Sequence, residues 1–472
     1  MAQESMPSEQ ILESKLSEIA VAGRCFQIRW RHLAQISAWV FVAFLLPMPA
    51  RGETLLETYT LARQSDPKYR AAQAEALAAG TAIDQARAGF LPTLKFDTEK
   101  TETRQRIVDS QNVLYGAGVT TFQTTNKTLS LTQAIFRKDV IERYEQAKSV
   151  VRQAGFTLLA AEQDLQLRTA AAYLVVLAAA DSLALASAER EATGKVLELA
   201  RAKLKSGLGT ITNQHDALAR FSAAQAREIE AQNKLRDARQ GLREITGRLI
   251  ENVQTLRDEF PLELPDPPVV ERWVESALEQ NLLLRAKREA VDVARLEVER
   301  QRAGYFPSLN ILAGHNRRDA GSTLYGGGSD VKTTDVTLRL SVPIYEGGLT
   351  SAVTEEAAHR YQKSQEDLEQ ERRGVDRATR NAYNSTLSGV SLVEALRQTV
   401  VAQQSALDAK AEGLKSGLFA LLPVLDAGRD LYLAKRDYAQ SRYDYLFNRL
   451  RLKQAVGTLA EADLVQISEA LQ

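Results

Sequence analysis

The sequence predicts a mainly α-helical protein with a small β part, built from two copies of one unit, and three observations support this prediction. The 472 residues are rich in Ala, Leu, Gln, Glu and Arg, which are good helix formers. A helix-stopping phrase occurs twice, as QARAGFLPTL around Pro92 and as QRAGYFPSL around Pro307, 215 residues later. LKSGL at 204–208 returns at 414–418, 210 residues later, so the chain is an internal duplication.

The first 52 residues predict an export signal. Basic residues precede the apolar run AWVFVAFLLPMPA at 38–50, and Ala50-Arg51-Gly52 places small residues where a signal peptidase cleaves. The run has 13 residues, fewer than the roughly 20 that span a bilayer as a helix. The single cysteine, Cys25, lies in this leader, so we expect a mature chain from about Glu53 without a thiol or disulfide.

Alternating residues predict a β-hairpin after each helix stop. In TDVTLRLSVPIY, the apolar residues Val336, Leu338 and Leu340 alternate with polar ones, which is the period of a strand with one apolar face. Leu94 and Phe96 share one face in the same way in the first copy. We therefore expect four strands, with these helix-to-strand transition residues: Gly89, Pro92, Gly304 and Pro307.

A long polar-periodic segment follows each hairpin. About 68 residues of helix span roughly 100 Å, so such a helix needs neighbours along its whole length, and the spacing of Leu197 and Ala200 is typical of a coiled-coil seam. Each LKSGL ends a long helix, and a return helix follows; Thr212 is expected to cap the first return helix and Pro423 to lie in the first turn of the second. After the leader, the best candidate for a membrane-spanning helix is the 11-residue run at 170–180, which we interpret as an alanine-rich packing face.

These segments predict a signal peptide, two repeats, a proline-rich connector and a short C-terminal segment. The signal peptide, with a long N-region, is predicted at 1–52, the connector at 260–268 and the C-terminal segment at 459–472. Repeat 1, at 53–259, is predicted to contain a helix at Leu55–Ala88, a β-hairpin at 92–136, a long helix at 138–205 and a return helix at 212–247. Repeat 2, at 269–458, is predicted to contain a helix at Val269–Ala303, a β-hairpin at 307–345, a long helix at 347–416 and a return helix at 423–457.

Four strands with an apolar outer face do not close a barrel within one chain. Small closed barrels need at least about eight strands, and an open edge in lipid leaves unpaired amides that cost several kcal/mol each. An assembly of chains could close it, and three copies would supply 12 strands and 12 helical columns.

The whole set of motifs, in this order, resembles the TolC family of outer membrane efflux proteins over essentially the whole mature chain. The resemblance rests on the duplication, on AGFLPTL with AGYFPSL, on LSLTQAIF with LRLSVPIY, and on KSGLGTIT with KSGLFALLPVLDA. It implies a homotrimer with a 12-strand β-barrel in the outer membrane of a Gram-negative bacterium, continued by a 12-helix periplasmic α-barrel with an equatorial belt to which 459–472 would belong. Such proteins are passive exit ducts for type I protein secretion or multidrug efflux, docked to a periplasmic adaptor (a membrane fusion protein) and to an inner-membrane pump of the ABC or RND type.

The resemblance also implies site residues at the hairpin tips. Thr212 matches a gate threonine, and Asp426 matches an aspartate that forms a cation-attracting ring in the trimer. Asn213, Leu414 and Phe419 stand where the family has other latch residues, so we expect a more apolar gate with one acidic ring. The tips that would dock the adaptor are Ser206, Gly207, Leu208, Ser416, Gly417 and Leu418.

Other functional classes have little support. Lys plus Arg and Asp plus Glu are 60 each, so no net charge favours nucleic acid. The four histidines are scattered, and the GAG and GGG turns lack the lysine of a phosphate loop, so we expect no enzyme, metal or cofactor. The alternative is a periplasmic coiled-coil scaffold or adaptor without a pore, against which the matching β-hairpins speak. The cargo stays open, with a slight preference for proteins because of the gate departures.

Overall fold

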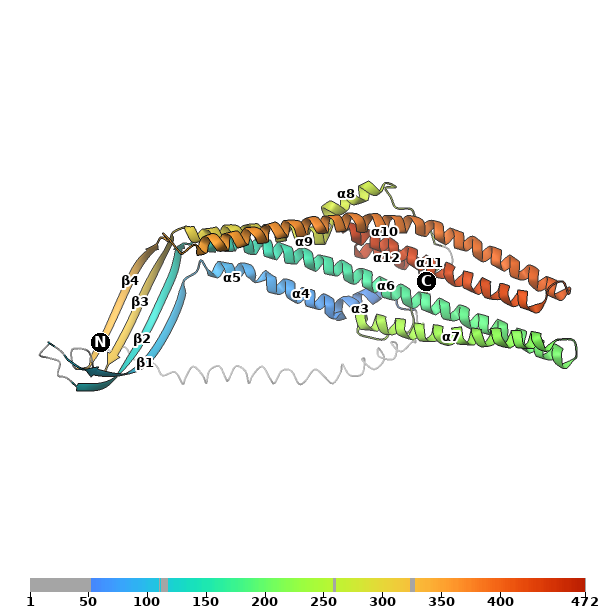
Figure 1. Ribbon diagram of the computed structural model, residues 1–472, viewed down its shortest axis with the longest axis horizontal. Coiled ribbons are helices and arrows are strands. Elements are labelled where there is room, and N and C mark those ends of the chain that lie inside the picture. The colour runs from blue at the N-terminus through green and yellow to red at the C-terminus, as the bar shows by residue number, and fades with distance from the viewer. Residues whose placement is uncertain (1–51, 110, 112–117, 258–259, 323–326, 472) are drawn as a thin grey trace, which may run out of the picture. The chain divides into compact units, whose positions relative to one another are not determined.

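The computed structural model describes residues 52–471, with gaps at 110, 112–117, 258–259 and 323–326. The predicted signal peptide, with Cys25, lies outside the described residues except for Gly52. The helices and strands described below belong to one unit, Glu53–Gln472 (Figure 1).

The helix predicted at 55–88 is interrupted twice. At the first break, the Asp66 carboxylate accepts a hydrogen bond of 2.6 Å from the Tyr69 N–H. Pro67 follows at the first helical position, where a missing N–H is harmless. The prediction of one helix was therefore wrong, because Asp66-Pro67 starts a new one. The resulting helices are α3 (Leu55–Ser65), α4 (Pro67–Gly80) and α5 (Ala82–Ala88).

The second copy repeats this break, so the prediction of one helix at 269–303 was also wrong. Asn281 stands 215 residues after Asp66 and caps the next helix, because its side-chain oxygen accepts the Leu284 N–H at 3.0 Å. Its amide donates to the Ala455 carbonyl at 2.9 Å. The elements are α8 (Val270–Gln280), α9 (Leu282–Arg302) and the short 3-10 helix η1 (Ala303–Tyr305).

Four antiparallel strands form one sheet in chain order, and they are β1 (Thr93–Ile107), β2 (Gly118–Phe136), β3 (Ser308–Ala320) and β4 (Ser329–Ser341). Pro92 and Pro307 directly precede β1 and β3. The predicted hairpins correspond to β1–β2 and β3–β4, and the pairing of β2 with β3 joins the two copies (Figure 1). β4 stops at Ser341, before the predicted end at 345, because Pro343 has no N–H for a ladder.

Each hairpin leads into a long helix and a shorter return helix. α6 lies against α7, α10 lies against α11, α9 lies against both α6 and α10, and α11 lies against α6 (Figure 1). The four helices are α6 (Lys138–Lys205), α7 (Ile211–Thr246), α10 (Leu349–Lys415) and α11 (Leu421–Val456).

Three predicted helix starts are corrected. α10 begins at Leu349 rather than at 347, because Gly348 adopts a left-handed φ of +86°. Thr210, not Thr212, caps α7, since its hydroxyl accepts a hydrogen bond of 3.2 Å from the Asn213 N–H. α11 begins at 421, before the predicted start at Pro423, which lies in its first turn.

Two buried tyrosines hold the connecting segments against the long helices. The Tyr173 hydroxyl of α6 donates to the Glu53 carbonyl at 2.8 Å and accepts the Gln254 N–H at 2.9 Å. The Tyr445 hydroxyl of α11 donates to the carbonyl of Glu263 and accepts the N–H of the same residue, at 2.9 and 2.8 Å. α12 (Glu461–Glu469), in the predicted segment 459–472, buries Leu464 in the same apolar core.

The hydropathy of α6 also corrects a prediction. By length and composition, α6 contains a segment long and apolar enough to cross a membrane, whereas the sequence analysis predicts only an 11-residue packing face at 170–180. Within the run at 170–180, Ala170, Leu174 and Leu177 are buried in the core with residues of α3 and α11. Packing against neighbouring helices therefore accounts for part of this apolar composition.

Candidate functional site

The sheet has one apolar and one polar face. Its register places Leu94 opposite Leu131, Leu131 opposite Ala313, and Ala313 opposite Val336. Leu94 and Val336 are 67% and 75% exposed. The neighbouring row, one residue further from the helices, lies on the other face and consists of Lys95, Ser130, Gly314 and Asp335. An apolar face this exposed needs lipid or another protein to cover it.

Both edges of the sheet are open within the described residues. β1 pairs with β2 and β4 pairs with β3, so one side of β1 and one side of β4 have no strand neighbour among the residues that the structure describes. An unpaired edge presents N–H and C=O groups that can pair with another chain. β1 and β4 run in opposite directions, so β4 of one copy can pair with β1 of the next in the antiparallel manner found within the sheet.

The predicted helix-to-strand transitions depend on close packing at two glycines. A Cβ on Gly89 would lie 2.8 Å from a Val140 methyl carbon, and a Cβ on Gly304 would lie 2.9 Å from the Thr350 methyl carbon. Val140 and Thr350 are buried near the starts of α6 and α10. Glycine is needed at both stops because the end of one helix lies directly on the first turn of the next.

Both hairpin tips have the same backbone turn. Gly207 and Gly417 have φ of +74° and +80°. The Leu208 N–H donates to the Lys203 carbonyl at 2.9 Å, and the Leu418 N–H donates to the Gly413 carbonyl at 2.7 Å. Together with the glycine N–H groups, which donate to the carbonyls of residues 204 and 414 at 3.1 and 3.3 Å, these bonds form Schellman motifs.

The leucine that follows each tip glycine lies in solvent. In many Schellman motifs this residue packs back against the helix, whereas Leu208 and Leu418 are 82% and 78% exposed. Two apolar side chains are thus presented at the ends of the hairpins, where the resemblance implied docking. They stay candidates for a partner contact.

The tips differ in one pair of positions. In the second tip, Phe419 lies over Gly413, and a Cβ on Gly413 would be 2.3 Å from the Phe419 ring. In the first tip, the equivalent residues are Gly209 and Lys203, and a Cβ on Gly209 would lie 3.1 Å from the Lys203 Cβ. Each turn has room for one side chain at this contact. Glycine is therefore the second residue of the pair in the first copy and the first residue of the pair in the second copy.

The predicted acidic residue Asp426 is paired rather than isolated. Arg220 of α7 donates to its carboxylate, and the Arg429 guanidinium lies 3.8 Å away. The Asp426 and Arg220 side chains are 36% and 29% exposed, so this ion pair is partly accessible and links the two hairpins of one chain. Arg220 was missed because nothing in the local sequence shows that α7 lies beside α11.

The other predicted gate residues occupy separate local environments. Thr212 is exposed, and the backbone N–H of Asn213 is used by the Thr210 cap. Leu414 is half-buried, and Phe419 packs on its own hairpin. Their role in a gate stays a prediction.

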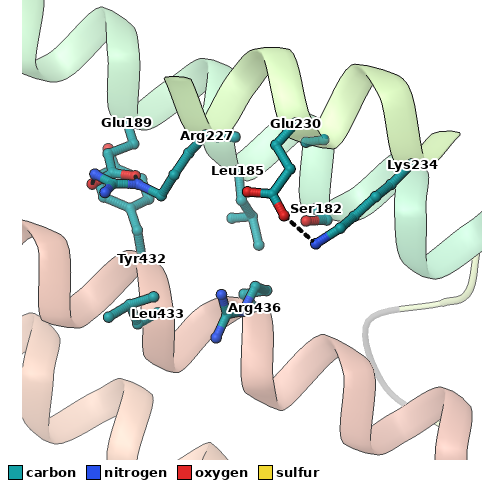
Figure 2. Close-up of a pocket in the computed structure, with 11 residues that line it drawn as sticks. Ser182, Leu185, Glu189, Arg227, Glu230, Lys234, Tyr432, Leu433 and Arg436 are labelled. Atoms are coloured by element: carbon teal, nitrogen blue, oxygen red, sulfur yellow. Dashed lines mark hydrogen bonds and ion pairs between the residues drawn. The ribbon is translucent and has the colours of Figure 1, made fainter. Parts of the chain in front are cut away.

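A second link between the hairpins lies along α6 and α11, and sequence reasoning missed it. Burial and the neighbouring Asp181 carboxylate raise the pKa of the Tyr443 hydroxyl, which donates to Asp181 at 2.6 Å. Nearer the tips, buried Glu189 of α6 accepts two hydrogen bonds from Arg227 of α7, at 2.6 and 3.0 Å, and this pair joins the two helices of the first hairpin. Figure 2 shows this pair beside Tyr432 of α11, where a cavity of about 140 Å³ separates the helices.

The described residues contain no group of three or more His, Cys, Asp or Glu side chains placed to hold a metal ion. The ionisable clusters named above consist of carboxylates that are bound to arginine or to tyrosine. Their arrangement favours links between helices.

Three comparisons with known proteins agree with this geometry. The family model described as outer membrane efflux protein matches residues 58–248 and 273–458, which correspond to the two copies. The chain is 31% identical over 423 residues to the outer membrane protein TolC of Vibrio cholerae, covering 89% of this chain and 94% of that protein. It is also 31% identical over 446 residues to the alkaline protease secretion protein AprF of Pseudomonas aeruginosa, covering 92% and 90%.

Solved structures show the same fold. The CmeC outer membrane channel of Campylobacter jejuni superposes with a TM-score of 0.75 at 14% identity, covering 91% of this chain and 94% of that one. The outer membrane protein VceC of Vibrio cholerae gives a TM-score of 0.71 at 19% identity, covering 85% and 96%. At these identities the likeness concerns the fold.

Proposed function

The chain belongs to the outer membrane efflux protein family and is an exit channel of the outer membrane, not an enzyme, and on this premise we propose that three copies form the passive duct of a tripartite export machine. The observation that carries the proposal is the four-stranded sheet. It is apolar on one face and polar on the other, it is open at both edges, and it leads into long helical hairpins.

The open edges support a trimer. Four strands are too few to close a barrel, whereas three copies joined from β4 to β1 supply 12 strands, with the exposed Leu94 and Val336 towards lipid. The helices would continue as 12 columns. In each copy, the short helices before the sheet lie along the part of the long helices nearer the sheet, and the return helix lies along the part nearer the tip (Figure 1).

The exposed tip leucines support docking. We propose that Leu208 and Leu418, each held outward by a Schellman turn, contact a periplasmic adaptor, which joins the duct to an inner-membrane pump of the ABC or RND type. The adjacent gate would combine the apolar Phe419 with the Asp426 carboxylate, whose charge Arg220 partly offsets.

The proposed cargo is protein exported in one step, with small-molecule efflux as the second candidate. AprF and the Dickeya chrysanthemi protein PrtF, which is 29% identical over 427 residues, are both named for protease secretion. Efflux is favoured by the family model and by the Brucella suis efflux protein BepC, 26% identical over 305 residues.

A deletion strain tests this proposal. The secreted proteome and the sensitivity to dyes, detergents and antibiotics are compared with the parent and with a complemented strain. Loss of a few secreted proteins with unchanged sensitivity supports the protein duct, and broad hypersensitivity with an intact secretome supports efflux. No change in either measurement contradicts both proposed cargoes.

The docking step has its own test. Replacement of both tip leucines, Leu208→Ser with Leu418→Ser, is expected to abolish export while the protein stays in the outer membrane at normal amounts. Leu264→Ser is a control, because Leu264 is a 59% exposed leucine in the connector. Normal export by the tip variant would remove these residues from docking.

A further inference from the structure

The apolar face of the sheet ends at a row of cations. The row lies on the same face as Phe96, two residues further along the strands and away from the helices. The register places Lys127 opposite Arg317 and Arg317 opposite Lys332. All three are exposed. The fourth position in this row is Thr98, opposite Lys127.

Such a row is unfavourable without an anionic partner. Like charges directly opposite each other on neighbouring strands destabilise a sheet. Arg317 forms a two-pronged ion pair with Asp330, at 2.7 and 3.1 Å, which offsets one of the three charges. The next row of this face carries Asp319 beside Asp330, and Lys100 on β1, so the two rows together keep a surplus of positive charge.

The position of the row matches a membrane boundary. Val342, an exposed apolar residue after β4, stands ten residues from Lys332, which is about 33 Å of extended chain. With the roughly 40° tilt of strands in closed barrels, this distance corresponds to a height of about 25 Å, equal to the usual apolar band.

The two boundaries of this band differ in chemistry. Near the helices the exposed side chains include the aromatic residues Tyr305, Phe306 and Tyr345, 57%, 49% and 87% exposed, which are typical of an interfacial girdle. At the far boundary the described strands carry Lys127, Arg317 and Lys332 instead. The far side therefore favours an anionic surface.

We propose that Lys127, Arg317 and Lys332 bind the phosphate groups of an anionic lipid in the outer leaflet. This inference rests on the proposed function, because the sheet must span the membrane. The apolar rows beside the cations would contact the acyl chains, the lysine stems can lie along them with the ammonium groups at the headgroups, and arginine suits phosphate oxygens. A soluble phosphate would use the cations without the apolar rows.

The test compares lipids that differ in phosphate. The mature full-length protein, purified in detergent, is titrated with lipid A that carries its two phosphates, with dephosphorylated lipid A, and with inorganic pyrophosphate. The row is neutralised in Lys127→Gln with Arg317→Gln and Lys332→Gln. The matched control removes three cations from the opposite face of the same sheet, in Lys95→Gln with Arg318→Gln and Arg339→Gln.

The wild type is expected to prefer the phosphorylated lipid. Each cation near a charged lipid surface contributes about a fivefold effect, so the row variant should bind phosphorylated lipid A on the order of 100-fold more weakly, while the control changes by less than about fivefold. Lys127→Arg with Lys332→Arg should retain binding, and it keeps the test decisive if the glutamine variant does not fold.

Three outcomes overturn the proposal: equal binding of both lipids by the wild type, equal losses in the row and control variants, or competition by pyrophosphate as strong as by the lipid. A wild-type protein that is absent from the outer membrane or supports no export contradicts the proposed function instead. The two failures are therefore distinguishable.

Discussion

The two hairpin tips have the same backbone turn but different side-chain contacts. The LKSGL sequence and the two hydrogen bonds of its Schellman motif recur in both copies, whereas the next contact is Gly209 on Lys203 in the first and Phe419 on Gly413 in the second. The comparison teaches that the duplicated unit retains the residues that set backbone geometry, while side-chain contacts have diverged in compensating pairs.

The largest expected difference between the copies lies at the ends of the return helices. Gly247 and Gly457 have φ of +75° and +90°, and a Cβ would lie 3.2 Å from the Ser65 Cβ in the first copy but 2.6 Å from the Gln280 carbonyl oxygen in the second. Both alanine substitutions cost about 1–2 kcal/mol for the left-handed conformation. Gly457→Ala must also displace backbone, so its total cost is expected to exceed about 3 kcal/mol.

This prediction is checked by thermal unfolding, followed by circular dichroism of the purified protein. Gly247→Ala serves as the matched control, because it has the same conformational cost without the backbone clash. Equal losses of stability in the two variants would contradict the comparison.

The next largest effect concerns the compensating pair at the tips. Gly413→Lys should displace the Phe419 ring and cost about 1–3 kcal/mol locally. Gly413→Lys with Phe419→Gly recreates the first tip and should recover most of this loss, which gives a coupling energy of at least about 1 kcal/mol. Hydrogen exchange of the Leu418 amide, which is bonded to the residue 413 carbonyl, measures the effect. Additive effects would show that the pair is not coupled.

The two copies are also expected to differ in how the helices before the sheet contribute to stability at different pH values. Burial would raise the pKa of Glu297, but hydrogen bonds from Arg300, Gln301 and Gln146 lower it to about 2. The lowered pKa stabilises the fold at pH values above the ordinary pKa near 4.5, and this contribution is lost as the pH falls through 2. The equivalent residue of the first copy is Ala82.

Glu297→Gln is therefore expected to reduce stability by about 1–2 kcal/mol at pH 7. It should also remove part of the loss seen in the wild type between pH 4.5 and 2. Unfolding in urea at several pH values measures this difference, and Ala82→Gln is the control in the other copy. A variant with the wild-type slope over this range would refute the assignment.

The smallest expected effect on stability comes from the partly exposed ion pair between Arg220 and Asp426, about 0.2–1 kcal/mol. The pair is also expected to affect the ion selectivity of the pore. Asp426→Asn should lower the preference for cations, and Arg220→Gln should raise it. Reversal potentials in planar bilayers measure this. Asp216→Asn, at the equivalent position of the first copy, is the matched control, and unchanged selectivity in both variants would remove the pair from the gate.

The strands and long helices could be predicted because their periods are local. The alternation of Val336, Leu338 and Leu340 predicted β4, and the structure exposes all three on one face. The breaks at Asp66 and Asn281 were missed, although both are capping residues, because a helical pattern continues on either side of them. The two capping residues occupy equivalent positions of the two copies, 215 residues apart, and this recurrence could have indicated both breaks.

The links between hairpins could not be predicted in the same way. Arg220 and Asp426, or Asp181 and Tyr443, are separated by more than 200 residues and meet only because α11 lies beside α6 and α7. In the sequence each looks like a polar residue on a solvated helix face. Pairing of this kind depends on how the two hairpins are rotated relative to each other. The periodicity within one hairpin does not determine this rotation.

The open edges of the sheet have a consequence for pore width. Each chain contributes its four strands as one block, so a ring closed from β4 to β1 can change its circumference only in multiples of four strands. Barrel diameter grows with strand number, and a head-to-tail ring closes only when the rotation between neighbours fits the copy number. In such a ring, the width of the passage would be adjusted by the side chains of the polar face, which can vary without a change in the number of chains.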